Sequence, residues 1–206
     1  MPSTQLLLAA ALMIGAYLAG SIPFSFLVAR ARGVDLRKVG SGNVGGANVW
    51  RSCGFGPFVV AAALDILKGA LPTFGTLRLL PGHPVVTILV GLAAILGHTF
   101  PVFLGFKGGK AVATSTGVLL AIVPLLIPFG IAAWALAFLL TRISSVASLS
   151  AAAVVLVVAT VLYLSGQMPL PYAVFIWATG ALIVYLHRAN IQRLIAGTEN
   201  RFSRLS

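Results

Sequence analysis

The sequence predicts an all-α polytopic membrane protein with seven transmembrane helices, one of them short, with the N-terminus outside and the C-terminus inside. Hydrophobic residues make up 59% of the 206 residues and charged residues only 8%, against roughly 25% charged residues in an average soluble domain. Apolar runs of about 18 residues or more recur along the chain, and each can cross about 30 Å of hydrocarbon. Basic residues gather in some of the segments between these runs and are absent from others, which indicates the orientation.

Six apolar stretches are visible before the charges are considered. The first, residues 4–29, has no basic segment before it, so we interpret it as a retained span rather than a cleaved signal peptide. The others cover residues 56–80, 85–104, 111–141, 145–164 and 170–186. They leave no room for a separate soluble domain, so residues 1–206 are expected to form a single integral membrane domain.

Stretch 111–141 is expected to form two helices. A single helix of that length would reach about 46 Å, well beyond the hydrocarbon core, and Pro124 and Pro128 interrupt it. Six spans would also place the basic tail opposite the first two basic segments, against the positive-inside rule. With seven spans, all basic residues except Lys68 and Arg78 lie on the cytoplasmic side: Arg30, Arg32, Arg37, Lys38, Arg51, Lys107, Lys110, Arg142, Arg188, Arg193, Arg201 and Arg204.

The net charge of +11 is therefore explained by topology and by contact with anionic lipid headgroups, and no nucleic acid is expected as a partner. Cys53 is the single cysteine, and no Cys/His set has the spacing of zinc ligands. No metal and no cofactor are predicted. Within the second span, Lys68 follows Asp65 by three residues, close enough on a helix to pair. Such a pair is a brace between helices or part of a catalytic site.

The first polar segment, Gly40 to Arg51, contains a G-x-G-x-x-G match. A dinucleotide fold is excluded, because charged residues rather than a buried strand precede the match. Glycine-rich backbone lets N–H groups converge on an anion, Ser41, Asn43 and Asn48 add neutral donors, and Arg51 suits phosphate or carboxylate. The alternative is a flexible loop whose basic residues only mark topology.

In the second polar segment, Lys107 and Lys110 flank Gly108 and Gly109 just before a helix is expected to begin. Exposed amides, a helix dipole and two ammonium groups would meet an anion there. The segment is not a Walker A loop, since Ala111 follows Lys110. Anchoring of the protein by the two lysines is the alternative. His98, further upstream, is interpreted as a hydrogen-bonding group at a helix end.

The third polar segment begins at His187, where the last span ends. On a helix His187 and Asn190 share one face and can address one ligand, and Arg188 lies beside them. A basic amphipathic helix on the lipid surface is the alternative. The span that follows Arg142 begins with hydroxyl groups, among them Ser145 and Ser148, which face the bundle or bond to their own helix. Three such segments on one face predict a phosphorylated substrate at the cytoplasmic interface.

These segments resemble the signature motifs of the bacterial acyl-phosphate:glycerol-3-phosphate acyltransferases, a family of seven-span inner-membrane enzymes. The motif Gly-Ser-Gly-Asn-x-Gly-Ala-Thr-Asn is similar to Gly40–Asn48, with Gly46 and Ala47 in place of Ala and Thr. The motif Phe-Lys-Gly-Gly-Lys-Gly-Val-Ala-Thr is similar to Phe106–Thr114, with Ala111 in place of the last glycine. The motif His-Arg-x-Asn-Ile-x-Arg-Leu matches His187–Leu194 at every specified position.

The resemblance implies transfer of a fatty acyl group from acyl phosphate to the 1-hydroxyl of glycerol 3-phosphate, giving lysophosphatidic acid and phosphate. We expect Arg51, Lys110, His187 and Asn190 to bind glycerol 3-phosphate, and Ser41 to polarise a reacting oxygen. Ser41 and His187 are the catalytic candidates, and the proton of the attacking hydroxyl goes to His187 or to a phosphate oxygen. The acyl phosphate and the remaining surroundings of the substrates are assigned to Gly42, Asn43, Asn48, Lys107, Gly108, Gly109, Arg188, Ser145 and Ser148.

The resemblance further implies the bacterial inner membrane with the active site facing the cytoplasm, contact with membrane lipid, and contact with the enzyme that produces acyl phosphate. An organophosphate transporter would place polar breaks near mid-membrane in two halves, and a metal-dependent phosphatidyltransferase needs clustered carboxylates. The chain has three acidic residues, Asp35, Asp65 and Glu199. Acyl-chain preference, oligomeric state and the effects of Ala47 and Ala111 are left open.

Overall fold

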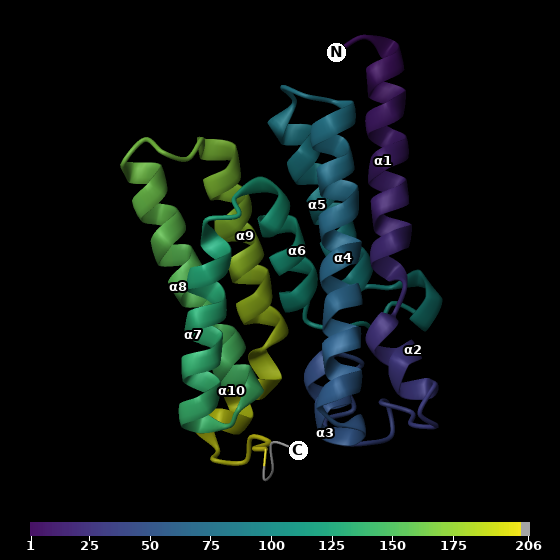
Figure 1. Cartoon of the computed structure of the whole chain (residues 1–206), viewed down its shortest axis with the longest axis vertical. Coiled ribbons are helices and arrows are strands. Elements are labelled where there is room, and N and C mark those ends of the chain that lie inside the picture. Colours follow the sequence, from purple (N-terminus) through teal and green to yellow (C-terminus); the bar gives the residue numbers. More distant parts are fainter. Residues whose placement is uncertain (203–206) are drawn as a thin grey trace. The chain divides into compact units, whose positions relative to one another are not determined.

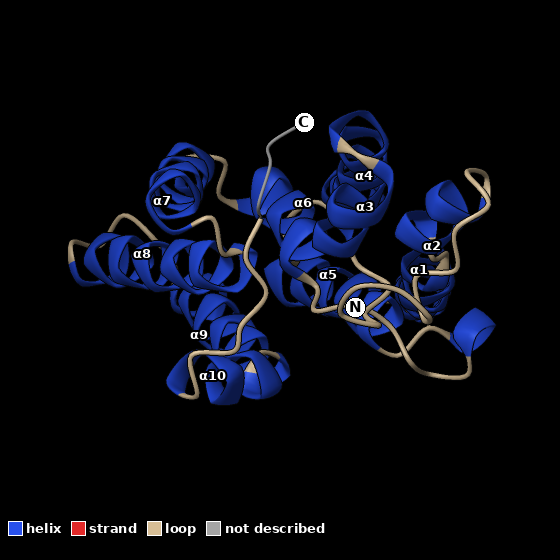
Figure 2. Ribbon diagram, turned by 90° about the horizontal axis from the view of Figure 1, so that it is seen from below, coloured by secondary structure: helices blue, strands red, loops and turns tan. Residues whose placement is uncertain are grey.

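The structure is a computed structural model that describes residues 1–202; Arg204, counted above among the cytoplasmic basic residues, lies outside this range. Over the described residues the chain consists of α-helices, one 3-10 turn and loops, without a strand (Figure 2). This confirms the predicted all-α class. The described residues divide into two compact units, 1–122 and 123–202, and each is described by itself.

The first unit contains four longer helices that run alongside one another, together with shorter elements at one end (Figure 1). Its elements are α1 (Ser3–Ser21), α2 (Phe24–Arg30), α3 (Gly46–Cys53), α4 (Phe55–Leu79), α5 (Pro84–Thr99), the 3-10 turn η1 (Val102–Leu104) and α6 (Val112–Ile122). Helix α5 packs against α1 and α4, and α4 also packs against α6, α3 and α2.

The first apolar stretch does not form one continuous helix. It ends at Ser21 and resumes at Phe24, because Pro23 lacks an N–H group and disfavours helical backbone at the residue before it. Ile22 accordingly has ψ of 117°. The expected first span is still long and apolar enough to cross a membrane, and the break brings the Ile22 carbonyl and the Ser25 hydroxyl beside α4.

Glycines allow α1 and α5 to approach at the level of their backbones. A Cβ at Gly20 would lie 2.2 Å from the carbonyl oxygen of Ala94, and a Cβ at Gly97 would lie 2.2 Å from the carbonyl oxygen of Tyr17. Any side chain at either position would force the two helices apart. Close contact through small residues is the usual way in which helices associate in lipid.

The second unit contains α7 (Leu126–Thr141), α8 (Ser144–Leu164), α9 (Leu170–Leu186) and α10 (Arg188–Ile195), with α8 packed against both α7 and α9. The chain bends by 54° between α9 and α10. The segment after α10 returns to the start of α8, where Phe202 N donates to Arg142 O at 2.9 Å. The Phe202 ring packs edge-on against Phe138.

The division of stretch 111–141 into two helices is confirmed, since α6 and α7 are separated at residues 123–125. Four segments of the described chain are long and apolar enough to cross a membrane, and a fifth if the bent pair α9 and α10 forms one span. The four are Ser3–Arg30, Phe55–Leu79, Pro84–Leu104 and Ser144–Leu164. Helices α6 and α7 are apolar but shorter, so seven spans and their orientation stay a prediction.

Candidate active site

The first glycine-rich segment forms a loop that ends in the first turn of α3. Gly40 and Gly42 have φ of +57° and +70°, a left-handed conformation that glycine adopts at no steric cost. At Gly40 there is also no space for a side chain, because a Cβ would lie 2.2 Å from Asn48 Oδ1. Backbone conformation and close packing therefore both require glycine at position 40.

Asn48 holds this loop in place from within. Its side chain is buried, and Nδ2 donates to the carbonyl oxygens of Leu36, Val39 and Asn43 at 3.0, 3.1 and 2.9 Å. Its Oδ1 accepts from Ser41 N at 3.3 Å. The expectation that Asn48 donates to a substrate is wrong for this conformation, because both amide hydrogens are engaged by the loop.

The other candidates of this segment are differently placed. Ser41 and Gly42 are exposed at the loop surface, and Asn43 is half-buried. Arg51 lies in α3 three residues after Asn48 and is half-buried. The loop therefore presents the hydroxyl of Ser41 outward while Asn48 fixes the backbone beneath it.

The second glycine-rich segment closes over the end of α5. Gly108 N donates to Thr99 O and Gly109 N donates to His98 O, both at 3.1 Å. These bonds satisfy carbonyl groups that the last turn of a helix leaves without partners. The expectation of exposed Gly108 and Gly109 amides is therefore wrong, and both N–H groups serve the helix end.

The two glycines are required by space. A Cβ at Gly108 would lie 2.1 Å from His98 O, and a Cβ at Gly109 would lie 2.3 Å from His98 Nε2. Lys107 is exposed and Lys110 half-buried, and α6 begins two residues after Lys110, as predicted. Ala111 has φ of +60°, which explains why glycine is usual at that position of the motif.

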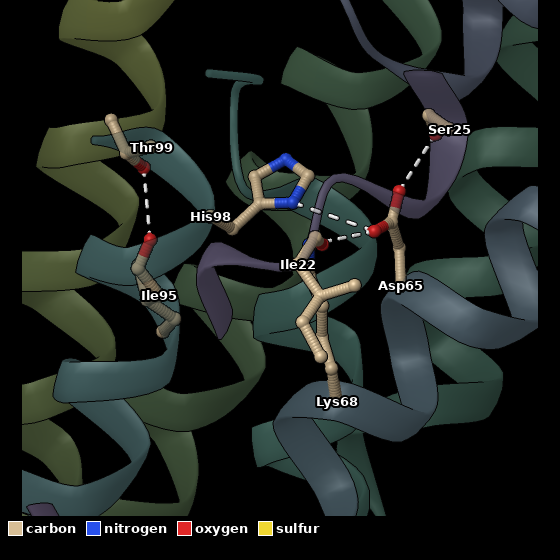
Figure 3. Close-up of polar contacts among 7 residues, drawn as sticks. All are labelled: Ile22, Ser25, Asp65, Lys68, Ile95, His98 and Thr99. Atoms are coloured by element: carbon tan, nitrogen blue, oxygen red, sulfur yellow. Dashed lines mark hydrogen bonds and ion pairs between the residues drawn. The ribbon is translucent and has the colours of Figure 1, made fainter. Parts of the chain in front are cut away.

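A buried polar cluster lies beneath this loop (Figure 3). Lys68 Nζ lies 2.8 Å from Asp65 Oδ1 and donates to Ile22 O at 2.8 Å. Ser25 Oγ donates to Asp65 Oδ2 at 2.7 Å, and His98 Nδ1 lies 3.6 Å from Asp65 Oδ1. The predicted pairing of Asp65 with Lys68 is confirmed. His98 is at a helix end as expected, but its ring faces Asp65, which the sequence did not indicate.

The cluster lines a small, partly open pocket. Both glycine-rich loops reach this pocket, the first through Val44 and the second through Gly108 and Gly109. Ser21, on the rim beside them, is fully buried, and its hydroxyl has no hydrogen-bond partner among the described residues. The first unit therefore brings two of the three signature segments to one polar pocket.

In the second unit, His187 lies at the bend between α9 and α10 and is buried. Its Nδ1 lies 2.8 Å from the carbonyl oxygen of Ile183. Since a carbonyl oxygen can only accept, Nδ1 carries the hydrogen, and in the neutral ring Nε2 bears the lone pair. When its ring is neutral, His187 is therefore the tautomer that accepts a proton at Nε2. The bend replaces the single helix expected through His187 and Asn190.

Asn190 and Ser145 meet at a carboxylate that the sequence analysis did not single out. Ser145 Oγ and Asn190 Nδ2 donate to Glu199 Oε1 at 3.0 and 2.6 Å, and Arg193 Nε donates to Glu199 Oε2 at 2.7 Å. Burial alone would raise the pKa of Glu199, but the hydrogen bonds from Asn190, Arg193 and Ser145 outweigh it and lower the pKa. The rarity of acidic residues in the chain was the one signal available for Glu199.

The two remaining candidates of this unit stand apart from Glu199. Ser148 is half-buried in α8, one turn beyond Ser145. Arg188 is exposed, lies over the Tyr185 ring at 4.4 Å and donates to Tyr185 O at 3.2 Å. Within residues 1–202, no group of three or more His, Cys, Asp or Glu side chains is arranged to hold a metal ion.

Apolar spans, with basic and glycine-rich segments at their ends, define an integral membrane protein that handles anionic substrates. The family model described as glycerol-3-phosphate acyltransferase matches residues 10–197. The chain belongs to the glycerol-3-phosphate acyltransferase family and is an enzyme of that class.

Relatives of the same name cover almost the whole chain. The glycerol-3-phosphate acyltransferase of Roseiflexus sp. (strain RS-1) is 59% identical over 195 residues, covering 95% of this chain and 96% of the relative. That of Aquifex aeolicus (strain VF5) is 44% identical over 191 residues, covering 93% and 97%.

The fold is similar to crystal structures of PlsY (YgiH), an integral membrane glycerol 3-phosphate acyltransferase. The glycerol 3-phosphate form is 43% identical with a TM-score of 0.87, covering 95% of this chain and 96% of that chain. The lysophosphatidic acid form is 42% identical with a TM-score of 0.85, covering 95% of both chains.

Proposed function

We propose that this enzyme transfers a fatty acyl group from acyl phosphate to the 1-hydroxyl of glycerol 3-phosphate and releases lysophosphatidic acid and phosphate. The observation that carries the proposal is the presence of all three motifs of the acyl-phosphate-dependent enzymes in order along the chain. Similar PlsY chains were crystallised in a glycerol 3-phosphate form and a lysophosphatidic acid form, which supports the acceptor and the product.

In this reaction the hydroxyl oxygen attacks the acyl carbonyl carbon, the bond from that carbon to the phosphate oxygen breaks, and phosphate leaves. Because acyl phosphate is already an activated anhydride, the protein has to position two anions and balance their charge. The hydroxyl proton goes to His187 Nε2 or to a phosphate oxygen. The hydrogen bond from Nδ1 to Ile183 O supports the first route.

The proposed roles follow the chemistry of the side chains. Arg51, Lys110, His187 and Asn190 bind glycerol 3-phosphate, and Ser41 polarises a reacting oxygen. The acyl phosphate lies against the loop of Gly42 and Asn43 and against Lys107. Arg188, Ser145 and Ser148 are further substrate-binding candidates. Asn48, Gly108 and Gly109 enter this proposal as residues that shape the two loops, in keeping with their hydrogen bonds.

We further propose that residues 1–206 work as one domain with seven spans in a bacterial inner membrane, with the basic segments and the active site on the cytoplasmic side. Membrane lipid surrounds the spans, and the enzyme that makes acyl phosphate is a candidate partner. Single cysteines in a Cys53→Ser background test the topology. Cysteine at exposed Ala31 should react with an impermeant reagent from the cytoplasm, and cysteine at exposed Ser165 only from outside.

The activity is tested with purified protein, acyl phosphate and labelled glycerol 3-phosphate, with acyl-CoA in a parallel sample. Formation of lysophosphatidic acid from acyl phosphate supports the proposal; its absence, or a clear preference for acyl-CoA, refutes it. Arg51→Ala and Lys110→Ala should raise KM for glycerol 3-phosphate. Arg78→Ala and Lys38→Ala remove exposed cations of the same types and should leave KM unchanged.

A further inference from the structure

Asp65 and Lys68 lie outside the three signature segments, and His98 lies just upstream of Lys107 in the second. No step of the reaction uses this cluster. Asp65 and Lys68 are both almost completely buried in a helix that is apolar enough to span a membrane. Burying two charges is costly unless their geometry is good and further hydrogen bonds satisfy them. The partners of the two charged groups therefore indicate what the cluster does.

Those partners come from three elements other than α4. Lys68 holds the carbonyl of Ile22 at the break between α1 and α2, and Ser25 of α2 donates to Asp65. His98 of α5 supplies the third contact. A pair that only offset its own burial would not need partners outside α4. The arrangement links the broken first helix to the end of α5.

The link continues from His98 into the second glycine-rich loop. The backbone of His98 accepts from Gly109 N, and the ring lies so close to Gly109 that only glycine fits there. Lys110 is the next residue. The contacts therefore run from Asp65 to the ring of His98, from that ring and the His98 carbonyl to Gly109, and along the backbone to Lys110.

We propose that Asp65, Lys68 and His98 are positioning residues that hold the loop of Gly108 and Gly109, and with it Lys110, in the geometry that binds glycerol 3-phosphate. This rests on the proposed role of Lys110. None of the three residues needs to touch the substrate. Their effect is on the affinity for glycerol 3-phosphate rather than on the bond-breaking step, so KM should respond more than kcat.

If Asp65 and Lys68 only braced the helices, their loss would not affect substrate binding in a folded protein. A double variant distinguishes this structural role from the positioning role. Asp65→Asn alone leaves the Lys68 charge buried without its counter-ion and can unfold the protein. Asp65→Leu combined with Lys68→Met removes both charges, and replacing a buried ion pair by apolar side chains is often neutral or stabilising. The double variant should therefore fold with an unchanged thermal midpoint. If the pair were only a brace, activity would also be unchanged.

The positioning role predicts that the folded double variant has KM for glycerol 3-phosphate raised at least about tenfold, since a displacement of 1 Å can cost on the order of 100-fold in rate. His98→Leu should have the same effect, and His98→Gln, which keeps a polar side chain beside Asp65, should restore part of it. Thr76→Val is the matched control, because Thr76 is a buried polar residue of α4 whose hydroxyl donates to Pro72 O of its own helix.

Equilibrium binding of labelled glycerol 3-phosphate to the purified, full-length variants completes the test, because it needs no acyl donor. Weaker binding by the double variant and by His98→Leu, with normal binding by Thr76→Val, supports the inference. Normal binding by the folded double variant overturns it. If wild type binds glycerol 3-phosphate but transfers no acyl group from acyl phosphate, the proposed function fails while weakened binding by the variants still supports the positioning role.

Discussion

Replacing Asn48 by Asp should release the first glycine-rich loop while the helices stay folded. The substitution keeps the shape of the side chain but exchanges its two N–H donors for an oxygen. The carbonyl oxygens of Leu36, Val39 and Asn43, which now accept from Nδ2, would then face a carboxylate. The same change leaves Oδ1 able to accept from Ser41 N, so it tests the donors alone.

The expected cost follows from the burial of these contacts. The hydrogen bond to Leu36 O is buried, and those to Val39 O and Asn43 O are partly buried. Water can therefore hydrogen-bond to Val39 O and Asn43 O in part after the Asn48 donors are lost. A buried polar group left without a partner costs about 1–3 kcal/mol, which gives a total on the order of 3 kcal/mol. At about 1.4 kcal/mol per factor of ten, the loop would open roughly a hundredfold more often.

Hydrogen exchange measured by mass spectrometry reports this directly. The amide of Gly42, which donates to Val39 O, and the amide of Ser41 should lose protection, whereas those of α4 should keep it. Asn43→Asp is the control for charge, because it adds the same carboxylate to the same loop at a side chain with no hydrogen bond within the described residues. Unchanged protection of Ser41 and Gly42 in Asn48→Asp would refute the assigned role of the side chain.

Three further predictions concern other positions. The pKa of Glu199 in the folded protein lies below its ordinary value of 4.5. Ionised Glu199 therefore stabilises the fold fully above pH 4.5, and this stabilisation is lost as the pH falls through the folded pKa. Glu199→Gln should lower the thermal midpoint at pH 7 and make the midpoint fall less steeply in acid. Gly109→Ala should reduce kcat/KM at least about tenfold by displacing His98, while Gly15→Ala, which meets nothing within 4 Å, should not. Ala111→Gly relieves left-handed strain of about 1 kcal/mol and loses a buried methyl worth about 0.8 kcal/mol, so the midpoint should barely change; a large shift in a melting curve would contradict this balance.

Hydropathy and charge predicted most of the helical framework, because each span has to satisfy its backbone within its own segment. The division of stretch 111–141 was predictable from Pro124 and Pro128 and is confirmed by α6 and α7. Pro23 offered the same kind of signal for the break after α1. It was overlooked because the apolar run continues unchanged on both sides of it.

The site was less predictable, because its contacts join residues far apart in the chain. The spacing of Asp65 and Lys68 predicted their pairing, but nothing local connects Asp65 to Ser25 or His98. The amides of Gly108 and Gly109 were expected to be exposed, since the sequence does not show that the loop folds back on the end of α5. Composition indicates which groups are present at a site, whereas tertiary packing decides which of them already have a partner.

The packing of α1 on α5 has a consequence for biosynthesis. Tyr17 donates to the carbonyl of Phe100, a partner 83 positions later in the chain, and Gly20 fits against Ala94. At about 5–20 residues per second, translation needs roughly 4–17 seconds to supply that partner. During this interval α1 lacks the α5 surface against which Gly20 packs. Membrane insertion and assembly of the first helix are thus separate events in time, and a lesion at Gly20 or Gly97 would act on the second event only.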